Sequence, residues 1–291
     1  MRKEDSLESG LVLYEVGDRV ATITLNRPEV LNAIISPMWQ ELNEGIAEAN
    51  RDPEVRVIRL RGAGHSFCAG FDFGAQGDLA AQNAEQPTWD PGADMIGVTN
   101  PWDGPVPNFM GLWSSPKPTI AQVHGWCVGG GSDMALSADL VIAAEDAQIG
   151  TPYSRVWGCY LTGMWVYRLG LAKAKEYALT GKPLTGEEAA KVELINRAVP
   201  ADQLDEEAEK LANQLAQNPV SQLAAMKLIV NQAYENMGLR TTQVLGSVLD
   251  GYMRNTPEAH AFVEKAVTEG VPAAVAERDG PFQDYSQRPR K

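Results

Sequence analysis

The sequence predicts an α/β layered fold that is followed by a helical carboxyl-terminal region. Short apolar runs alternate with amphipathic helical patterns up to about Thr180, and the pattern is helical from there onward. Such an alternation is typical of a sheet covered by helices. At 291 residues, of which 44% are hydrophobic, the chain is long and apolar enough to bury a sizeable core.

The strands are predicted from short apolar runs that end in turn residues. LVLYEV (residues 11–16) and VATITL (20–25) flank a Gly-Asp turn and predict a hairpin. VRVIRLRG (55–62), TIAQVHG (119–125) and DLVIAA (139–144) predict three further buried strands. Glycine turns or helical patterns separate these runs, as a layered sheet requires.

The first helix is predicted directly after the hairpin, over the segment SPMWQELNEGIAEANRD. Ser36 suits the N-cap and Pro37 the first helical position. Met38, Leu42 and Ile46 share one face of such a helix. We therefore expect this face to pack on the sheet.

The carboxyl-terminal part carries its own helix signals. Thr185 and Glu188 have the spacing of a capping box, and amphipathic runs cover residues 202–217 and 220–235. The run over residues 220–235 and the end of the run over 202–217 carry more large apolar residues than a thin helical layer can bury. Exposed apolar patches of this kind mark interfaces. These residues are Leu211, Leu215, Leu223, Met226 and Ile229.

Two regions are expected, an α/β core over residues 1–200 and a helical region over 201–291. Within the core, residues 74–113 form a long irregular segment rich in proline and tryptophan. A loop of this length is typical of a lid over a binding pocket. We expect one of three tryptophans to contribute an apolar wall to that pocket: Trp89, Trp102 or Trp113.

The composition argues against several classes of protein. The net charge of −13 disfavours nucleic-acid binding, which needs a basic surface. No apolar run reaches the roughly 20 residues that cross a bilayer, and the charged amino end lacks a signal sequence, so we expect a cytoplasmic protein. Cys68, Cys127 and Cys159 have no CxxC spacing, which favours reduced thiols over a metal site.

Two glycine turns suggest a shared function. GHSFCAGFDF (64–73) and VHGWCVGGGSD (123–133) each follow a predicted strand and, on the pattern, open a helix. Backbone N–H groups at such turns lack partners, and two of them that converge on one point form an oxyanion hole. Neither turn has the G-x-G-x-x-G or P-loop pattern, so a nucleotide site fits badly.

Taken together, these motifs resemble the crotonase superfamily, typified by enoyl-CoA hydratase and isomerase. The matching pieces occur in family order up to about residue 235: ITLNRPEVLNAI (23–34), FCAGFD (67–72), KPTIAQVHGWCVGGGSDMALSADLVIAAEDAQIG (117–150), YRLG, and ALTGKPLTGEEAAKVELINRAVP (178–200). The resemblance implies a crotonase-like (ClpP/crotonase) spiral of ββα units with a carboxyl-terminal helical trimerisation region. It also implies an acyl-CoA substrate, no metal, no cofactor beyond the coenzyme A of the substrate, and a homotrimer or homohexamer.

The resemblance also assigns roles to residues. The N–H groups of Phe71 and Gly130 would hold the thioester oxygen as it becomes an enolate. Arg27 would meet phosphates of coenzyme A. The substrate contacts implied in this way are Arg27, Leu31, Ala33, Ala69, Gly70, Asp72, Phe73, Gly129, Pro152 and Trp157.

Only one of the two acidic residues of the family pattern has a counterpart in this sequence. Hydratases of this family carry two glutamates, and the first position is filled here by Asp133. In IGTPYSRVWG the second position falls on Tyr153 when Pro152 is aligned and on Ser154 when Gly158 is aligned. Neither is an acid, and a tyrosine with a pKa near 10 orients water but is a poor base at neutral pH.

Three functions are compatible with this pattern. The first is an enoyl-CoA hydratase-like lyase in which Asp133 transfers protons and Tyr153 or Ser154 places water. The second keeps the oxyanion hole but catalyses isomerisation of an enoyl-CoA or hydrolysis of a thioester. The third is an acyl-CoA-binding protein without turnover, which an assay with a short enoyl-CoA would separate from the other two.

Overall fold

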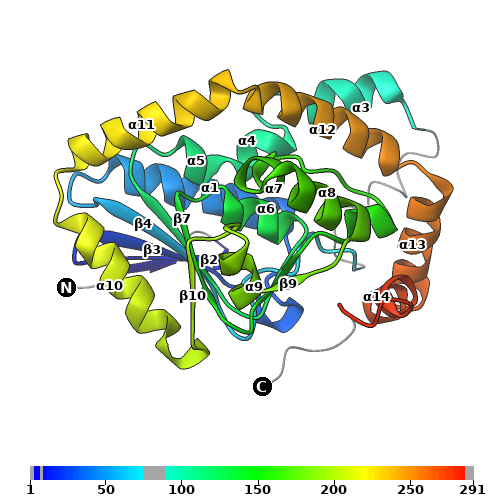
Figure 1. The fold of residues 1–291 in the computed structure, drawn as a ribbon, viewed down its shortest axis with the longest axis horizontal. Helices are drawn as coiled ribbons and strands as arrows, with labels where there is room; N and C mark the ends of the chain where they lie inside the picture. The colour runs from blue at the N-terminus through cyan, green and yellow to red at the C-terminus, as the bar shows by residue number, and fades with distance from the viewer. Residues whose placement is uncertain (1–2, 7–8, 75–88, 286–291) are drawn as a thin grey trace.

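The central sheet runs through the middle of the molecule (Figure 1). The computed structural model describes residues 3–6, 9–74 and 89–285. Among these, seven strands form the sheet in the order β1-β2-β3-β4-β5-β7-β10. The strands are β1 (Lys3–Ser6), β2 (Val12–Gly17), β3 (Val20–Leu25), β4 (Val57–Gly62), β5 (Thr119–Val123), β7 (Leu140–Ala144) and β10 (Arg197–Val199).

Parallel pairing dominates the sheet beyond the predicted hairpin. β2 and β3 form the expected antiparallel hairpin, and β4, β5, β7 and β10 continue the sheet in parallel. Every residue of β3 and β5 is buried, as is typical of parallel strands covered by other elements. The carboxyl ends of the parallel strands therefore meet at one edge, where sites of α/β proteins form.

A second, three-stranded sheet carries the glycine-rich turn. It has the order β6-β8-β9, with β6 (Trp126–Val128), β8 (Gln148–Gly150) and β9 (Leu184–Thr185). β6 ends directly before the three glycines, and β8 ends directly before the segment that carries Tyr153. Both ends deliver their next residues to the same place because β6 and β8 are parallel.

The helices confirm most of the predicted positions. The helix α1 begins at Ser36, so its N-cap is Ile35, one residue earlier than expected. Met38, Leu42 and Ile46 are buried, and the capping box at the start of α9 is present. The helices of the core are α1 (Ser36–Arg51), α6 (Gly130–Leu136), α7 (Met164–Arg168), α8 (Leu171–Thr180) and α9 (Gly186–Lys191), with the short 3-10 helices η1 (Pro28–Val30) and η2 (Pro152–Arg155).

The helical region lies along the left, top and right of the core in the view of Figure 1. It consists of η3 (Ala201–Gln203), α10 (Leu204–Ala216), α11 (Val220–Asn236), α12 (Leu239–Met253), α13 (Pro257–Thr268) and α14 (Val271–Asp279). α10 packs on the sheet, whereas α11 buries none of its residues. Met226 and Ile229 on α11 and Leu245 on α12 are more than half exposed, so much of their apolar surface has no partner within the described chain.

In the described part of the predicted lid segment, the chain forms the short helices α3 (Pro91–Val98), α4 (Pro105–Phe109) and α5 (Gly111–Ser114). Part of the prediction, residues 75–88, lies outside the described residues. Trp102 is 82% exposed and Trp113 packs edge-on against Tyr234 of α11. Phe109 of α4, rather than these tryptophans, lies against the second glycine turn.

Candidate active site

The two glycine turns lie side by side. Cys68 donates its N–H to Trp126 (2.9 Å) and accepts from Val128 (3.0 Å), so the first turn runs parallel to β6. A Cβ built on Gly70 would lie 2.9 Å from the carbonyl oxygen of Val128 and 3.7 Å from the nitrogen of Gly130. Glycine is required here because Gly70 has a φ of +90° and no room for a side chain.

In each turn, the N–H group expected to bind the oxyanion has no backbone acceptor among the described residues. Gly130 is the first residue of α6, so its N–H has no intrahelical acceptor. On either side of Phe71, the Ile34 N–H donates to the carbonyl of Gly70 and the Asp72 N–H donates to the carbonyl of Ile34. The N–H of Phe71 itself takes no part in this pairing. Within the described part of the chain, no oxygen accepts from either donor. Two free donors on adjacent turns are suited to stabilise an oxyanion.

The first turn differs from the expectation in one respect. It was predicted to open a helix, but residues 71–74 are not helical and residues 75–88 lie outside the described residues. The isolated bridge between Ile34 and Phe71 positions the turn instead. The donor at Phe71 is therefore fixed by pairing with the segment before α1 rather than by a helix terminus.

An aromatic cluster forms an apolar wall beside the two donors. Trp39, Phe71 and Phe109 pack edge-on in a cluster, with centroid distances of 4.4 to 5.9 Å. A Cβ on Gly130 would lie 2.9 Å from Cζ of Phe109 and 3.3 Å from Cδ1 of Ile34. This apolar wall lowers the local dielectric and so strengthens hydrogen bonds made by the donors.

Asp133 lies three residues after Gly130 on α6 and is fully buried. Its Oδ2 accepts a hydrogen bond from the Tyr153 hydroxyl (2.6 Å), and its Oδ1 accepts one from the Thr162 hydroxyl (2.7 Å). Burial raises the pKa of Asp133 to about 6, although both hydroxyls oppose the shift. The carboxyl group therefore gains and loses a proton close to neutral pH, as an acid or base of a reaction must.

Tyr153 joins Asp133 to the glycine turn. A Cβ on Gly129 would lie 3.9 Å from the Tyr153 hydroxyl oxygen, so this hydroxyl borders the same space as the donors. Burial and the charge of Asp133 raise the pKa of Tyr153 well above its ordinary value, so the hydroxyl stays protonated and donates to Asp133. Ser154 is exposed and faces away, toward Thr180. The structure brings Tyr153, and not Ser154, to the carboxylate.

The arginine expected at the phosphates has partners of its own. Arg27 is buried, and its guanidinium donates to the carbonyl of Ala33 (2.5 Å) and to Asp72 (3.0 Å). Three residues expected to contact substrate thus hold one another. Leu31 is 37% exposed and accepts the N–H of Ala69 (3.0 Å), which ties the same loop to the first turn.

The sequence analysis did not identify two residues that hold the site together, Asn32 and Thr162. Asn32 is buried, accepts the N–H of Arg27 (2.8 Å) and donates to the carbonyls of Ala63 (2.9 Å) and Ser66 (2.7 Å). Its φ of +55° is a conformation that asparagine tolerates, and this could have marked the position. Thr162, by contrast, follows an irregular segment with no recognisable motif.

The remaining predicted contacts lie along η2 and the carboxyl-terminal helices. Pro152 is buried and begins η2. Phe73 packs edge-on against Trp157 (5.2 Å between centroids) and Phe262 of α13 (5.5 Å). Phe73 and Trp157 therefore join the first turn to the helical region.

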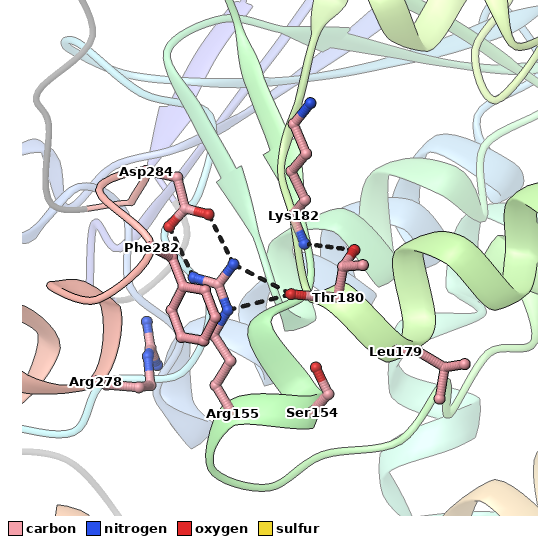
Figure 2. Close-up of a pocket in the computed structure, with 8 residues that line it drawn as sticks. All are labelled: Ser154, Arg155, Leu179, Thr180, Lys182, Arg278, Phe282 and Asp284. Atoms are coloured by element: carbon pink, nitrogen blue, oxygen red, sulfur yellow. Dashed lines mark hydrogen bonds and ion pairs between the residues drawn. The ribbon is translucent and has the colours of Figure 1, made fainter.

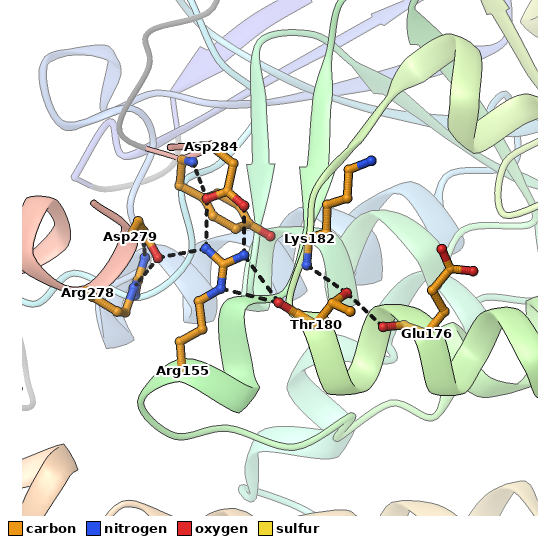
Figure 3. A network of polar contacts seen from close by, with 8 residues as sticks. Arg155, Glu176, Thr180, Lys182, Arg278, Asp279 and Asp284 are labelled. Atoms are coloured by element: carbon orange, nitrogen blue, oxygen red, sulfur yellow. Dashed lines mark hydrogen bonds and ion pairs between the residues drawn. The ribbon is translucent and has the colours of Figure 1, made fainter. Parts of the chain in front are cut away.

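A separate polar cluster occupies the outer side of η2, beside a cavity of about 680 Å³ (Figure 2). Arg155 pairs with Asp279 (3.0 Å) and with both oxygens of Asp284 (2.7 Å each), and its side chain is 4% exposed (Figure 3). We call residues 279–285 the carboxyl-terminal strap. Arg155 is already paired with two carboxylates, so we place the chemistry at the glycine turns and not in this cavity.

Other reactive groups have structural surroundings. Burial raises the pKa of the Cys68 thiol to about 12, which disfavours a thiolate nucleophile. His124 contacts the carbonyl oxygen of Gly64 at 3.0 Å. In the described ranges, no group of three or more His, Cys, Asp or Glu residues is arranged to hold a metal ion, and no helix is long and apolar enough to cross a membrane.

Known proteins with similar sequences and structures include enoyl-CoA hydratases and an isomerase that acts on an acyl-CoA. A family model for enoyl-CoA hydratase/isomerase matches residues 15–269. A probable enoyl-CoA hydratase of Mycobacterium bovis is 30% identical over 281 residues, covering 93% of this chain and 97% of the relative. The 1,2-epoxyphenylacetyl-CoA isomerase of Escherichia coli is 34% identical over 77% of this chain and 83% of its own. The crystal structure of an enoyl-CoA hydratase from Mycobacterium smegmatis matches with a TM-score of 0.87 at 43% identity, over 96% of each chain.

Proposed function

The chain belongs to the enoyl-CoA hydratase/isomerase family of the crotonase superfamily, and from this membership we propose that it adds water to the double bond of an enoyl-CoA thioester. It is an acyl-CoA-processing enzyme of the lyase or isomerase type. One observation supports the proposal most directly. Two free backbone donors, at Phe71 and Gly130, border the same space as the Asp133–Tyr153 pair.

The proposed mechanism places the thioester oxygen between the two N–H groups. When a nucleophile adds to C3, the second carbon from the thioester carbonyl, electrons move onto that oxygen and form an enolate. The donors at Phe71 and Gly130 stabilise this charge, and each such donor contributes a factor of about 10²–10³ where it has been removed. A proton from the Asp133–Tyr153 pair then reaches C2 and completes the addition.

An enoyl-CoA isomerase is the second candidate, favoured by the isolation of Asp133. Both oxygens of this carboxylate are occupied by hydroxyl groups, and no second carboxylate lies on η2. A single carboxylate suffices to move a proton between two carbons of the acyl chain. Hydrolysis of a thioester, with water as the nucleophile, is a variant that uses the same oxyanion hole.

Turnover of crotonyl-CoA and longer trans-enoyl-CoA thioesters, followed as loss of the conjugated chromophore, tests the proposal. We expect the parent enzyme to hydrate at least one of them and Asp133→Asn to bind it with unchanged affinity but turn it over ~10²–10⁴-fold more slowly. Asp146→Asn, in an exposed turn, is the matched control and should retain activity. Migration of the double bond without hydration would favour the isomerase, and binding without any turnover would exclude both.

We also propose that copies of the chain assemble into a trimer or a pair of trimers, and that the protein acts in the cytoplasm. The exposed apolar surface of α11 and α12 supports assembly, since closed association covers such surfaces. Light scattering across a dilution series tests this: a monomer that stays active at low concentration would contradict it.

A further inference from the structure

We propose that Ser132 and Trp165 are positioning residues of the oxyanion hole, which hold and polarise the peptide unit that carries the Gly130 donor. This inference rests on the proposed function, because it concerns how the donor for the thioester oxygen is kept in place. Ser132 is the third residue of α6, and Trp165 lies on α7. Neither side chain is among the groups that the proposed mechanism uses.

The peptide unit between Gly129 and Gly130 determines the direction of the donor. A trans peptide unit is planar, and its C=O and N–H groups point in opposite directions. The N–H of Gly129 donates to the carbonyl of Gly150 (2.8 Å), which ties the start of the turn to β8. The carbonyl oxygen of Gly129 accepts the backbone N–H groups of Ser132 (2.9 Å) and Asp133 (3.1 Å). The groups that hold this carbonyl therefore also direct the N–H of Gly130, on the opposite edge of the same plane.

The side chain of Ser132 is a third donor to that carbonyl. Its hydroxyl lies 2.8 Å from the Gly129 oxygen, closer than either backbone N–H. Ser132 is fully buried, so bulk water does not compete for the hydroxyl. Hydrogen bonds in a chain polarise one another, so a bond to the carbonyl makes the N–H of the same unit a stronger donor. The hydroxyl thus both orients and strengthens the Gly130 donor.

A tryptophan from another helix distinguishes this bond from an ordinary local one. Serines in helices commonly bond a carbonyl three or four residues back. Here Nε1 of Trp165, 33 residues along the chain, also donates to Oγ of Ser132 (3.0 Å). Trp165 is fully buried and stacks on Tyr160, with 5.8 Å between the ring centroids and 9° between the planes. The indole therefore has a fixed direction, and its N–H leaves the serine hydroxyl to donate to the Gly129 carbonyl.

The segment that carries Trp165 also holds the acid of the site. Thr162, three residues earlier, donates to Oδ1 of Asp133 (2.7 Å), and Asp133 directly follows Ser132 on α6. Two bonds from one segment thus reach two adjacent residues of α6. One bond fixes the carboxyl group and the other supports the oxyanion donor. The placement of the acid relative to the donor is therefore determined by a single short segment.

Ser137 supplies a matched control at the other end of α6. It is the C-cap of the helix and is fully buried, and its hydroxyl donates to the carbonyl of Met134 (2.7 Å), again three residues back. Ser132→Ala and Ser137→Ala therefore remove the same kind of bond from the same helix at the same burial. Only the first bond belongs to the peptide unit of the Gly130 donor. If the Ser132 hydroxyl only stabilised α6, the two variants would behave alike.

The experiment uses butyryl-CoA with an isotope-labelled thioester carbonyl, a saturated ligand to which water does not add. Infrared difference spectroscopy measures the downshift of the carbonyl stretching frequency on binding, and a second assay follows exchange of the C2 proton in D₂O. We expect Ser132→Ala to reduce the downshift, to slow exchange about 3–10-fold and to bind butyryl-CoA within about threefold of the parent affinity. Trp165→Phe, which keeps a ring but lacks the indole N–H, should reduce the downshift by less. Ser137→Ala should leave both quantities unchanged.

The outcomes separate this role from the proposed function. The parent downshift and exchange rate in Ser132→Ala would overturn the positioning role, as would equal losses in Ser132→Ala and Ser137→Ala. If Ser132→Ala does not fold, an unchanged downshift in Trp165→Phe would overturn it instead. A parent enzyme that binds butyryl-CoA without any downshift would overturn the oxyanion hole and both proposals. A parent enzyme that shows the downshift but turns over no enoyl-CoA would overturn the proposed hydration alone.

Discussion

Tyr153 and Arg155 lie two residues apart on η2, yet their surroundings differ in kind. On the inner side, Tyr153 meets a buried carboxylate that has no cation beside it, and burial raises the pKa of Asp133 to about 6. On the outer side, Arg155 meets two carboxylates of the strap. There burial alone would raise the pKa of Asp284, but Arg155 and backbone N–H groups lower it below its ordinary value.

The two sides of this short helix therefore have different roles. The outer cluster satisfies its charges and so stabilises the fold, whereas the inner pair holds a carboxyl group in a state that costs stability. Functional sites keep such unfavourable arrangements because surrounding structure compensates for them. We therefore expect substitutions on the outer side to change stability more than turnover, and substitutions on the inner side to do the opposite.

Arg155→Ala should have the largest effect on stability. It leaves Asp279, which is fully buried, with Arg278 alone and removes the bidentate partner of Asp284. Loss of one partner of a buried ion pair costs about 3–5 kcal/mol. Chemical denaturation should show this loss, while kcat of the folded fraction should fall only a few-fold. Arg51→Ala, in an exposed pair, should change stability by less than about 1 kcal/mol.

Gly130→Pro tests the donor on the inner side. It removes the N–H and should lower kcat by a factor of about 10²–10³. The added ring also approaches Phe109, so Gly130→Ala is the control, because it brings a Cβ to the same place and keeps the N–H. If both variants lose the same activity, packing against Phe109 explains the loss and the N–H has no part in it.

Asp133→Asn should raise stability at neutral pH. The folded pKa of about 6 lies above the ordinary value of 3.8, so the parent loses stability as pH rises between these values. At about 1.4 kcal/mol per pKa unit, the amide should increase the free energy of unfolding by up to about 3 kcal/mol near neutral pH and by little near pH ~3. Urea denaturation at several pH values measures this. A less stable variant at neutral pH would contradict the inner-side assignment.

Tyr153→Phe should have the smallest effect. It keeps the ring and removes the hydroxyl that donates to Asp133, so kcat should fall about tenfold. Since that hydrogen bond lowers the pKa of Asp133, its loss should move the high-pH limb of the activity profile upward. Tyr160→Phe, whose hydroxyl lies 3.4 Å from Thr151, is the control and should leave this limb in place.

The sequence predicts well what short-range patterns determine. The buried face of α1, the hairpin and the capping box at Thr185 and Glu188 depend on spacings of a few residues, and the structure confirms them. The predicted start of α1 was one residue off: Ser36 is the first helical residue, and Ile35, whose side chain makes no capping hydrogen bond, is the N-cap. The crotonase-like fold follows from the order of several motifs and is confirmed by related structures.

Long-range pairing is what the sequence could not predict. Arg27 was expected at a phosphate, but its guanidinium pairs with Asp72, 45 residues away. Thr162 has no motif of its own, and only the tertiary fold brings its hydroxyl to Asp133, 29 residues away. The choice between Tyr153 and Ser154 likewise depends on the direction in which η2 turns. The sequence leaves this open because alignments on Pro152 and on Gly158 differ by one residue.

The position of the strap in the sequence also determines when Arg155 can meet its partners during synthesis. Arg155 is held by Asp279 and Asp284, which follow it by 124 and 129 residues. During synthesis on the ribosome, the glycine turns, Asp133 and Tyr153 emerge long before these partners do. The outer side of η2 can be fixed only after the strap is released, so premature termination leaves a chain with its donors and carboxylate but without its anchored helix. The anchor of η2 therefore forms only after the residues of the site have been synthesised.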